Sequence, residues 1–190
     1  MYIVFNNKMN NIILSFDCAN RSLAACALSG DNKIILLKVF DLTEGKICDT
    51  IKRARLLKIC LTSIDSMLEN TPPSRVLVEY QMSANDKSRC VSQQIVYHYS
   101  TLTEVSLVGP SLKNKVCFST DTSLNHSTFM EKYSSKYTAN KNHSKANFLY
   151  WLSLNNCTNI LADNLIQKKN IDDAADAFLQ IFGYLQYGQN

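Results

Sequence analysis

The stretch "NIILSFDCANRSLAACAL", residues 11–28, decides the class of fold. Its first half is a dense apolar run that ends at Asp17, which is typical of a central strand buried on both faces. "SLAACALS" (22–29) and "NKIILLKVFD" (32–41) are two further strand-like runs, and "SGDN" at 29–32 supplies a turn between them. Three consecutive strands with short links predict an antiparallel meander.

Helix-like and strand-like patterns alternate along the rest of the chain. We predict helices over residues 49–70, 85–102, 145–154 and 172–188, and strands over residues 74–80 and 104–110. The apolar stripe of the second helix runs from Val91 to Leu102. Strands separated by a helix need a crossover connection and therefore run parallel. The sequence thus predicts an α/β protein whose mixed five-stranded sheet, a three-strand antiparallel meander plus two parallel strands, is flanked by helices.

Length and composition indicate one globular domain. We expect the 190 residues to form a single domain, with residues 1–10 as a loose N-terminal extension. The seven cysteines are odd in number and contain no CxxC pair, which indicates reduced thiols in a cytosol-like compartment rather than a disulfide scaffold or a zinc site. No apolar run is long enough to span a bilayer and the start shows no secretory signal, so we expect a cytoplasmic protein without membrane attachment.

The net charge of +4 is concentrated in one segment of the chain. Residues 113–150 contain only two acidic side chains, Asp121 and Glu131, and their lysines are Lys113, Lys115, Lys132, Lys136, Lys141 and Lys145. The polar composition predicts loops and short helices with outward-facing lysines. A solvated surface and a phosphate-binding surface explain this charge equally well.

Carboxylates follow two of the predicted strands and open the last predicted helix. Asp17 and Glu79 each end an apolar strand, and the carboxyl ends of parallel neighbours share the edge where open α/β sheets build their sites. In "IDDAADAFLQ" (171–180), Asp173 and Asp176 lie three residues apart and share one helix face. Each acid also has an ordinary explanation as a turn former, an exposed edge charge or a helix cap. Their joint order favours a common site.

Such a group of carboxylates needs a compensating cation. An oxygen-only set of ligands favours hard ions such as Mg²⁺ or Mn²⁺. Two ions together would suit an in-line phosphoryl displacement, and the lysine-rich segment would then hold a phosphate backbone. The sequence therefore predicts a metal-dependent enzyme acting on phosphodiesters.

The first two strands, "VLVEYQMSANDKSRCVSQQIVYHYSTL" (76–102) and "DDAADAFL" (172–179) together resemble the RuvC-type Holliday-junction resolvases of the ribonuclease H-like superfamily, and most of all their poxvirus branch. The resemblance covers residues 11 to about 188. It implies that Asp17, Glu79, Asp173 and Asp176 bind two Mg²⁺ or Mn²⁺ ions per site, with Asp172 as an alternative because it lies four residues before Asp176. It also implies that Lys141 and Lys145, with His143 as an alternative, assist phosphate binding and catalysis.

The same resemblance implies a partner and an assembly. A homodimer would place two sites on opposing strands of a four-way DNA junction, and Tyr80 and Met82 would reach the junction centre. Lys113, Lys115, Lys136, Lys141 and Lys145 are then the expected contacts to the DNA backbone. The predicted function is cleavage of four-way and other branched DNA, which in a poxvirus would resolve genome concatemers in the host cytoplasm.

Other functions remain open from the residues alone. One is a DNA-binding module of the same fold without catalysis, which the complete acidic set disfavours. Another is an ATPase like actin or the sugar kinases, but five glycines leave little room for its phosphate loops. A cysteine nucleophile at Cys18 is disfavoured because the adjacent Asp17 would raise the pKa of its thiol.

Overall fold

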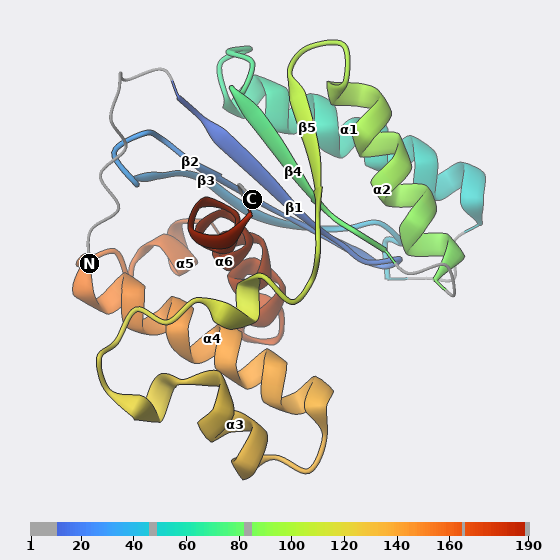
Figure 1. The fold of residues 1–190 in the computed structure, drawn as a ribbon. Coiled ribbons are helices and arrows are strands. Elements are labelled where there is room, and N and C mark those ends of the chain that lie inside the picture. Colours follow the sequence, from blue (N-terminus) through green and yellow to red (C-terminus); the bar gives the residue numbers. More distant parts are fainter. Residues whose placement is uncertain (1–10, 46–48, 82–84, 165, 189–190) are drawn as a thin grey trace.

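One mixed β-sheet organises the molecule. The computed structural model describes residues 11–45, 49–81, 85–164 and 166–188, so the predicted extension over residues 1–10 and the candidate Met82 lie outside the described residues. The strands are β1 (Ile13–Cys18), β2 (Ser22–Leu28), β3 (Ile34–Asp41), β4 (Arg75–Glu79) and β5 (Glu104–Val108). Their order across the sheet is β3-β2-β1-β4-β5 (Figure 1). The first three strands pair antiparallel, and β1, β4 and β5 run parallel, which confirms the predicted sheet.

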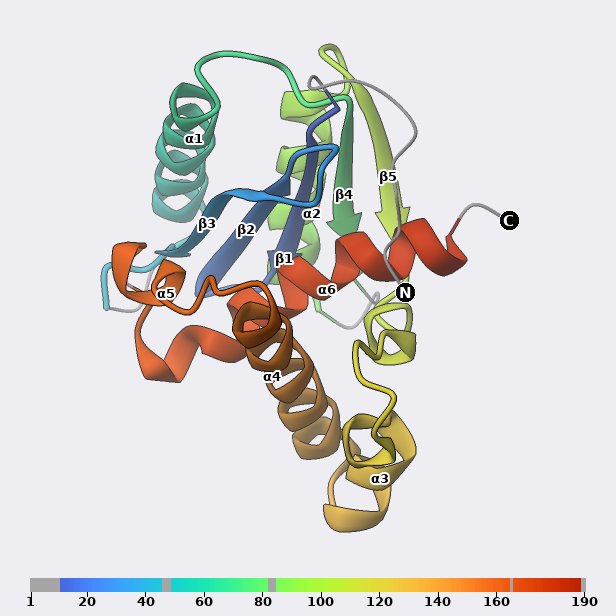
Figure 2. The same cartoon turned by 90° about the vertical axis from the view of Figure 1, so that its left-hand side faces the viewer.

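Helices cover both faces of this sheet. On one face lie α1 (Thr50–Met67) and α2 (Asp86–Tyr99), and on the other lies α6 (Ile171–Tyr187), with α4 (Lys136–Leu154) packed against it (Figure 2). The core is accordingly divided into two layers. Alternate β1 residues serve the two layers, because Leu14 and Phe16 pack with α1 and α2 whereas Ile13 packs with α6.

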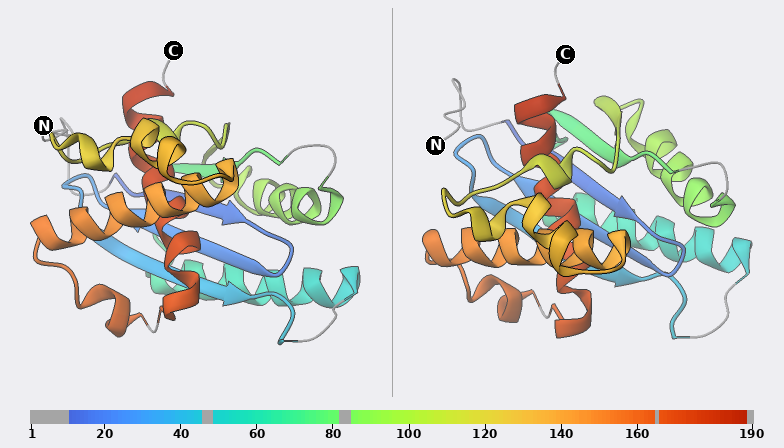
Figure 3. Two further views of the ribbon diagram at one scale, coloured as in Figure 1. Left: turned by 90° about the horizontal axis from the view of Figure 1, so that it is seen from below. Right: turned by 60° about the horizontal axis from the view of Figure 1, so that its bottom comes forward.

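Helix α6 is the most deeply buried helix of the fold. Every residue from Ala174 to Tyr184 is buried, because the helix crosses the sheet and is covered by α4 and by the short η1 turn (Lys113–Lys115) (Figure 3). The ring centroids of Phe178 and of Trp151 in α4 lie 4.8 Å apart. Small residues hold the helix close to its neighbours, and a Cβ on Gly183 would lie 2.8 Å from the backbone C and O atoms of Leu112.

The lysine-rich segment is more helical than we predict. After β5 come η1, η2 (Thr122–Leu124), α3 (His126–Lys132) and α4, while α5 (Ile160–Asp163) and η3 (Lys168–Asn170) precede α6. Helix α4 begins at Lys136, nine residues before the predicted start, because Ser135 caps it by accepting a hydrogen bond from the Thr138 N–H. The predicted end of the second helix is also wrong, since α2 stops at Tyr99 and leaves Leu102 56% exposed.

Two predictions about compartment can be compared with the fold. Each of the six cysteines in the described ranges is a free thiol. None of the described helices is long and apolar enough to cross a membrane.

Candidate active site

The strand-end carboxylates Asp17 and Glu79 lie side by side. Phe16 of β1 pairs with Val78 of β4 in the parallel register, so the next residue of each strand falls at an equivalent position. Both acids alternate away from the layer of Phe16 and Val78 and therefore face α6. Both are buried, and burial together with the neighbouring Glu79 and Asp176 raises the pKa of Asp17 although the Lys113 ammonium lowers it.

The first turns of α6 bring two further carboxylates to the same edge of the sheet. Asp176 is buried, and Asp173 accepts a hydrogen bond of 3.0 Å from the Ser22 hydroxyl at the start of β2. The N-cap residue, Asn170, makes no side-chain capping bond. Asp172 and Asp173 lie in the first turn, where the helix dipole favours an acid, but Asp176 lies beyond it, so a helix-end role does not account for Asp176. The structure thus brings together the four acids that the sequence singles out.

Lys113 lies in the middle of these carboxylates. Its Nζ is 2.8 Å from Asp176 Oδ2, 3.1 Å from Glu79 Oε1 and 4.0 Å from Asp17 Oδ1. Burial alone would lower the pKa of Lys113, but the charges of Asp17, Asp176 and Glu79 raise it above its ordinary value. The prediction that the lysines of this segment face outward is wrong for Lys113, because an ammonium beside three carboxylates is stabilised in the interior.

Lys141 makes a second set of ion pairs from α4. Its Nζ is 2.9 Å from Asp173 Oδ1, 3.2 Å from Asp172 Oδ2 and 3.5 Å from Asp176 Oδ2. Burial lowers the pKa of Lys141, and the charges of the carboxylates, with Asp176 the largest, raise it above its ordinary value. Lys141 therefore also faces inward. We call the five carboxylates of Asp17, Glu79, Asp172, Asp173 and Asp176, with Lys113 and Lys141, the ion cluster.

The chemistry of the ion cluster fits a hard divalent cation. All of its anionic donors are carboxylate oxygens, the ligand type that Mg²⁺ and Mn²⁺ prefer. Asp176 Oδ1 is buried and has no hydrogen-bond partner, so it is an oxygen in need of a cation. Among the described residues, no three His, Cys, Asp or Glu side chains are arranged to hold an ion as they stand. Two ammonium groups contact the carboxylate oxygens.

The other predicted residues lie around the ion cluster or away from it. His143 is fully buried, with its ring edge-on to His126, and burial and His126 lower its pKa to about 4. Its ring contacts His126 and Phe129 of α3, and both of its ring nitrogens are buried without a hydrogen-bond partner, so the structure shows no bond from His143 to the carboxylates of the described chain. Lys145 lies one helical turn beyond Lys141 and is half-buried, and the structure shows no ion pair between it and the acids of the described chain. The predicted DNA contacts Tyr80, Lys115 and Lys136 are exposed.

Two members of the site were not predicted in the roles that the structure gives them. Ser22 was not predicted at all, and a lone serine at the start of a strand offers no signal. Lys113 was expected only as a contact to DNA. A signal for its place does exist, because Lys113 follows β5 closely and β5 is parallel to β4, so the chain leaves both strands at the same edge.

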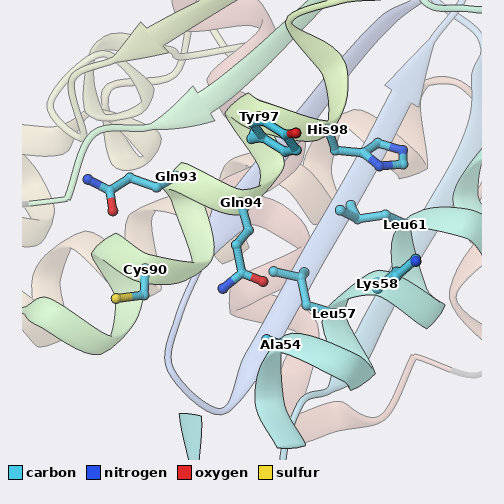
Figure 4. Close-up of a pocket in the computed structure, with 9 residues that line it drawn as sticks. All are labelled: Ala54, Leu57, Lys58, Leu61, Cys90, Gln93, Gln94, Tyr97 and His98. Atoms are coloured by element: carbon cyan, nitrogen blue, oxygen red, sulfur yellow. The ribbon is translucent and has the colours of Figure 1, made fainter. Parts of the chain in front are cut away.

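The opposite face of the sheet carries a different feature. A pocket of about 490 Å³ lies between α1 and α2, with Leu57 and Leu61 on one side and Gln94, Tyr97 and His98 on the other (Figure 4). His98 is held by Asp65, whose Oδ2 is 2.8 Å from His98 Nε2. The residues lining this pocket include no carboxylate, so the ion cluster is the better candidate for an active site.

Comparison with known proteins finds a similar fold but no similar sequence. No protein-family model and no curated protein sequence matches the chain. Solved structures do match. The fowlpox virus resolvase bound to Holliday junction DNA superposes with a TM-score of 0.61 at 20% identity, over 94% of this chain and 99% of that one. This is the fold of Holliday junction resolvases.

Two resolvases from other organisms share this fold. The yeast mitochondrial Holliday junction resolvase matches with a TM-score of 0.55 at 16% identity, over 96% of this chain and 83% of that one. RuvC of T. thermophilus in complex with a Holliday junction matches with a TM-score of 0.51 at 12% identity, over 94% and 96%. The expected resemblance of fold to the RuvC-type resolvases is confirmed.

Proposed function

We propose that the protein is a divalent-metal-dependent endonuclease that cleaves four-way and other branched DNA. The observation that carries the proposal is the convergence of Asp17, Glu79 and Asp176 from three separate elements on one buried edge of a resolvase-like sheet. The three solved structures compared above are Holliday junction resolvases, and two of them hold junction DNA. These comparisons support a phosphodiester substrate.

The residues of the ion cluster have distinct parts in this proposal. Asp17, Glu79, Asp173 and Asp176 would hold Mg²⁺ or Mn²⁺, two ions per site, with Asp172 as a further carboxylate at the helix end. When bound, these ions activate a water and neutralise charge on the scissile phosphate. Lys141 would stabilise the charge that develops on that phosphate, and Ser22 holds the orientation of Asp173. Burial of the carboxylates excludes bulk water from their inner faces.

The exposed residues around the site would bind the DNA. Lys115 of η1, with Lys136 and Lys145 of α4, would supply charge for the phosphate backbone. Tyr80 follows Glu79 directly and is 55% exposed. A four-way junction has two strands to cut, so a homodimer would supply the two sites. Resolution of viral genome concatemers in a cytoplasmic compartment is the role that the poxvirus-like fold suggests.

Two variants test the proposed chemistry. Asp17→Asn and Glu79→Gln each remove one charge at nearly constant shape, so Mg²⁺-dependent cleavage of a synthetic four-way junction should fall by about 10³-fold or more. Junction affinity in EDTA should stay within about threefold, because phosphate contacts dominate DNA binding. Glu104→Gln is the matched control, since this acid lies at the start of β5, pairs with Arg75 and is remote from the ion cluster.

The outcomes separate the alternatives. Undiminished cleavage by both variants would show that the site lies elsewhere. Junction binding without cleavage across a range of Mg²⁺ and Mn²⁺ concentrations would leave a DNA-binding module. Cleavage of flap, hairpin and linear duplex substrates under the same conditions measures how strictly the junction is preferred. An ATPase of the actin type is disfavoured because the strands of the described chain form one sheet rather than two lobes.

A further inference from the structure

The backbone around Lys113 is built to bring this residue to α6. The Leu112 N–H donates a hydrogen bond of 3.1 Å to the Gly109 carbonyl, and the Val116 N–H donates one of 3.2 Å to the Lys113 carbonyl. Gly183 has no side chain, which lets α6 and η1 approach closely. A Cβ added at Gly183 would lie only 3.1 Å from the backbone nitrogen of Lys113. The position of Lys113 is therefore set by the main chain and not by a flexible loop.

The ammonium of Lys113 is buried and forms ion pairs with carboxylates. Its side chain is only 10% exposed, and a buried ammonium is tolerated only when paired. Its partners come from three elements, since Asp17 ends β1, Glu79 ends β4 and Asp176 lies in α6. Without this charge, the three acids would repel one another at the edge of the sheet.

The two lysines of the ion cluster divide the acids between them. Lys141 contacts the three aspartates of α6, whereas the ion pairs to Asp17 and Glu79 are made by Lys113. Only Asp176 Oδ2 is shared, at 2.8 Å from Lys113 and 3.5 Å from Lys141. Lys113 is thus the cation that links the strand acids to the helix.

We infer that Lys113 is an internal counterion that holds Asp17, Glu79 and Asp176 together before metal binds, and that it competes with the divalent ion for their oxygens. The inference rests on the proposed metal-dependent function. It makes Lys113 a positioning residue whose loss should strengthen metal binding, whereas loss of a lysine that contacts only DNA should not. Metal binding then requires the ammonium to leave Glu79 and Asp176.

Lys113→Met tests this role, since methionine keeps the apolar stem and removes the charge. We expect its dissociation constant for Mn²⁺, measured by calorimetry on the full chain without DNA, to be about tenfold or more below that of the wild type, because a neighbouring positive charge is lost. In EDTA the melting temperature of the variant should be below that of the wild type, and saturating Mn²⁺ should reduce the difference between the two melting temperatures. Lys115→Met is the matched control, because this exposed lysine of the same turn makes no ion pair with the ion cluster, so its dissociation constant for Mn²⁺ should equal that of the wild type. Loss of its contact with the Tyr187 ring should change the melting temperature equally in EDTA and in Mn²⁺.

Each outcome bears on a different conclusion. Mn²⁺ binding by folded Lys113→Met that is equal to or weaker than that of the wild type would overturn the inference while leaving the proposed function intact. A wild-type protein that binds no Mn²⁺ would instead remove the proposed function. If Lys113→Met does not fold in EDTA, recovery of its circular dichroism spectrum on adding Mn²⁺ supports the inference, and failure of both Lys113→Met and Lys113→Gln to recover overturns it.

Discussion

Gly183→Ala should destabilise the protein although alanine is the better helix former. The residue lies inside α6, where a Cβ would be 2.8 Å from both the C and the O atoms of Leu112. These neighbours are backbone atoms, so no side chain can rotate away to make room. The methyl group must therefore push η1 away from α6 or tilt the helix.

The magnitude follows from two opposing terms. Overpacking of a buried contact costs about 1–3 kcal/mol. Replacing glycine by alanine in a helix interior contributes roughly 1 kcal/mol in the other direction. The net loss should be about 1 kcal/mol, which lowers the melting temperature of a chain of this size by about 2–4 °C.

Urea and thermal unfolding followed by circular dichroism measure this change directly. The sign of the change in unfolding free energy is enough to test the argument, because helix propensity without a clash predicts a variant that is more stable than the wild type. A stabilised Gly183→Ala would refute the close approach of η1 to α6. It would also weaken the argument that the backbone fixes Lys113, since both conclusions rest on the same contact.

Two further predictions concern α4. His143→Phe should flatten the pH dependence of the free energy of unfolding between pH 6.5 and 4. The unfolded histidine takes up its proton near pH 6.5 but the folded one only near pH 4, so the wild type loses roughly 3 kcal/mol of stability as the pH falls through this range. A variant with the pH profile of the wild type would contradict this. Lys141→Met should lower the single-turnover cleavage rate at saturating junction by about 10²-fold, and a loss confined to junction affinity would show that Lys141 only binds DNA.

The acidic half of the site could be predicted because it follows from local rules. Asp17 and Glu79 each end an apolar strand, and the parallel pairing of those strands fixes their relation. Asp173 and Asp176 share a face through helix periodicity alone. These inferences need only the type of each element and the order of the strands.

Lys141 was predicted as a site residue from the resemblance, but the ion pairs of Lys113 and Lys141 with the carboxylates could not be predicted, because they depend on tertiary packing. The inward direction of Lys113 follows from the path of the chain after β5 and from its contact with Gly183, which is 70 positions later in the printed sequence. The early start of α4 was missed because "KYTANKNH" (136–143) is polar and shows no clear apolar stripe, so the cap at Ser135 is the only local sign. Burial of His143 likewise needs α3 as a neighbour.

The hydrogen bond between Ser22 and Asp173 joins positions 151 residues apart in the chain. A ribosome must therefore release the chain as far as Asp173 before the first and last parts of the site can meet. Unfinished chains, and fragments cut between α4 and α6, would carry Asp17 and Glu79 without their helical partners. Under the proposed function, cleavage of DNA would therefore have to wait until synthesis has passed α6.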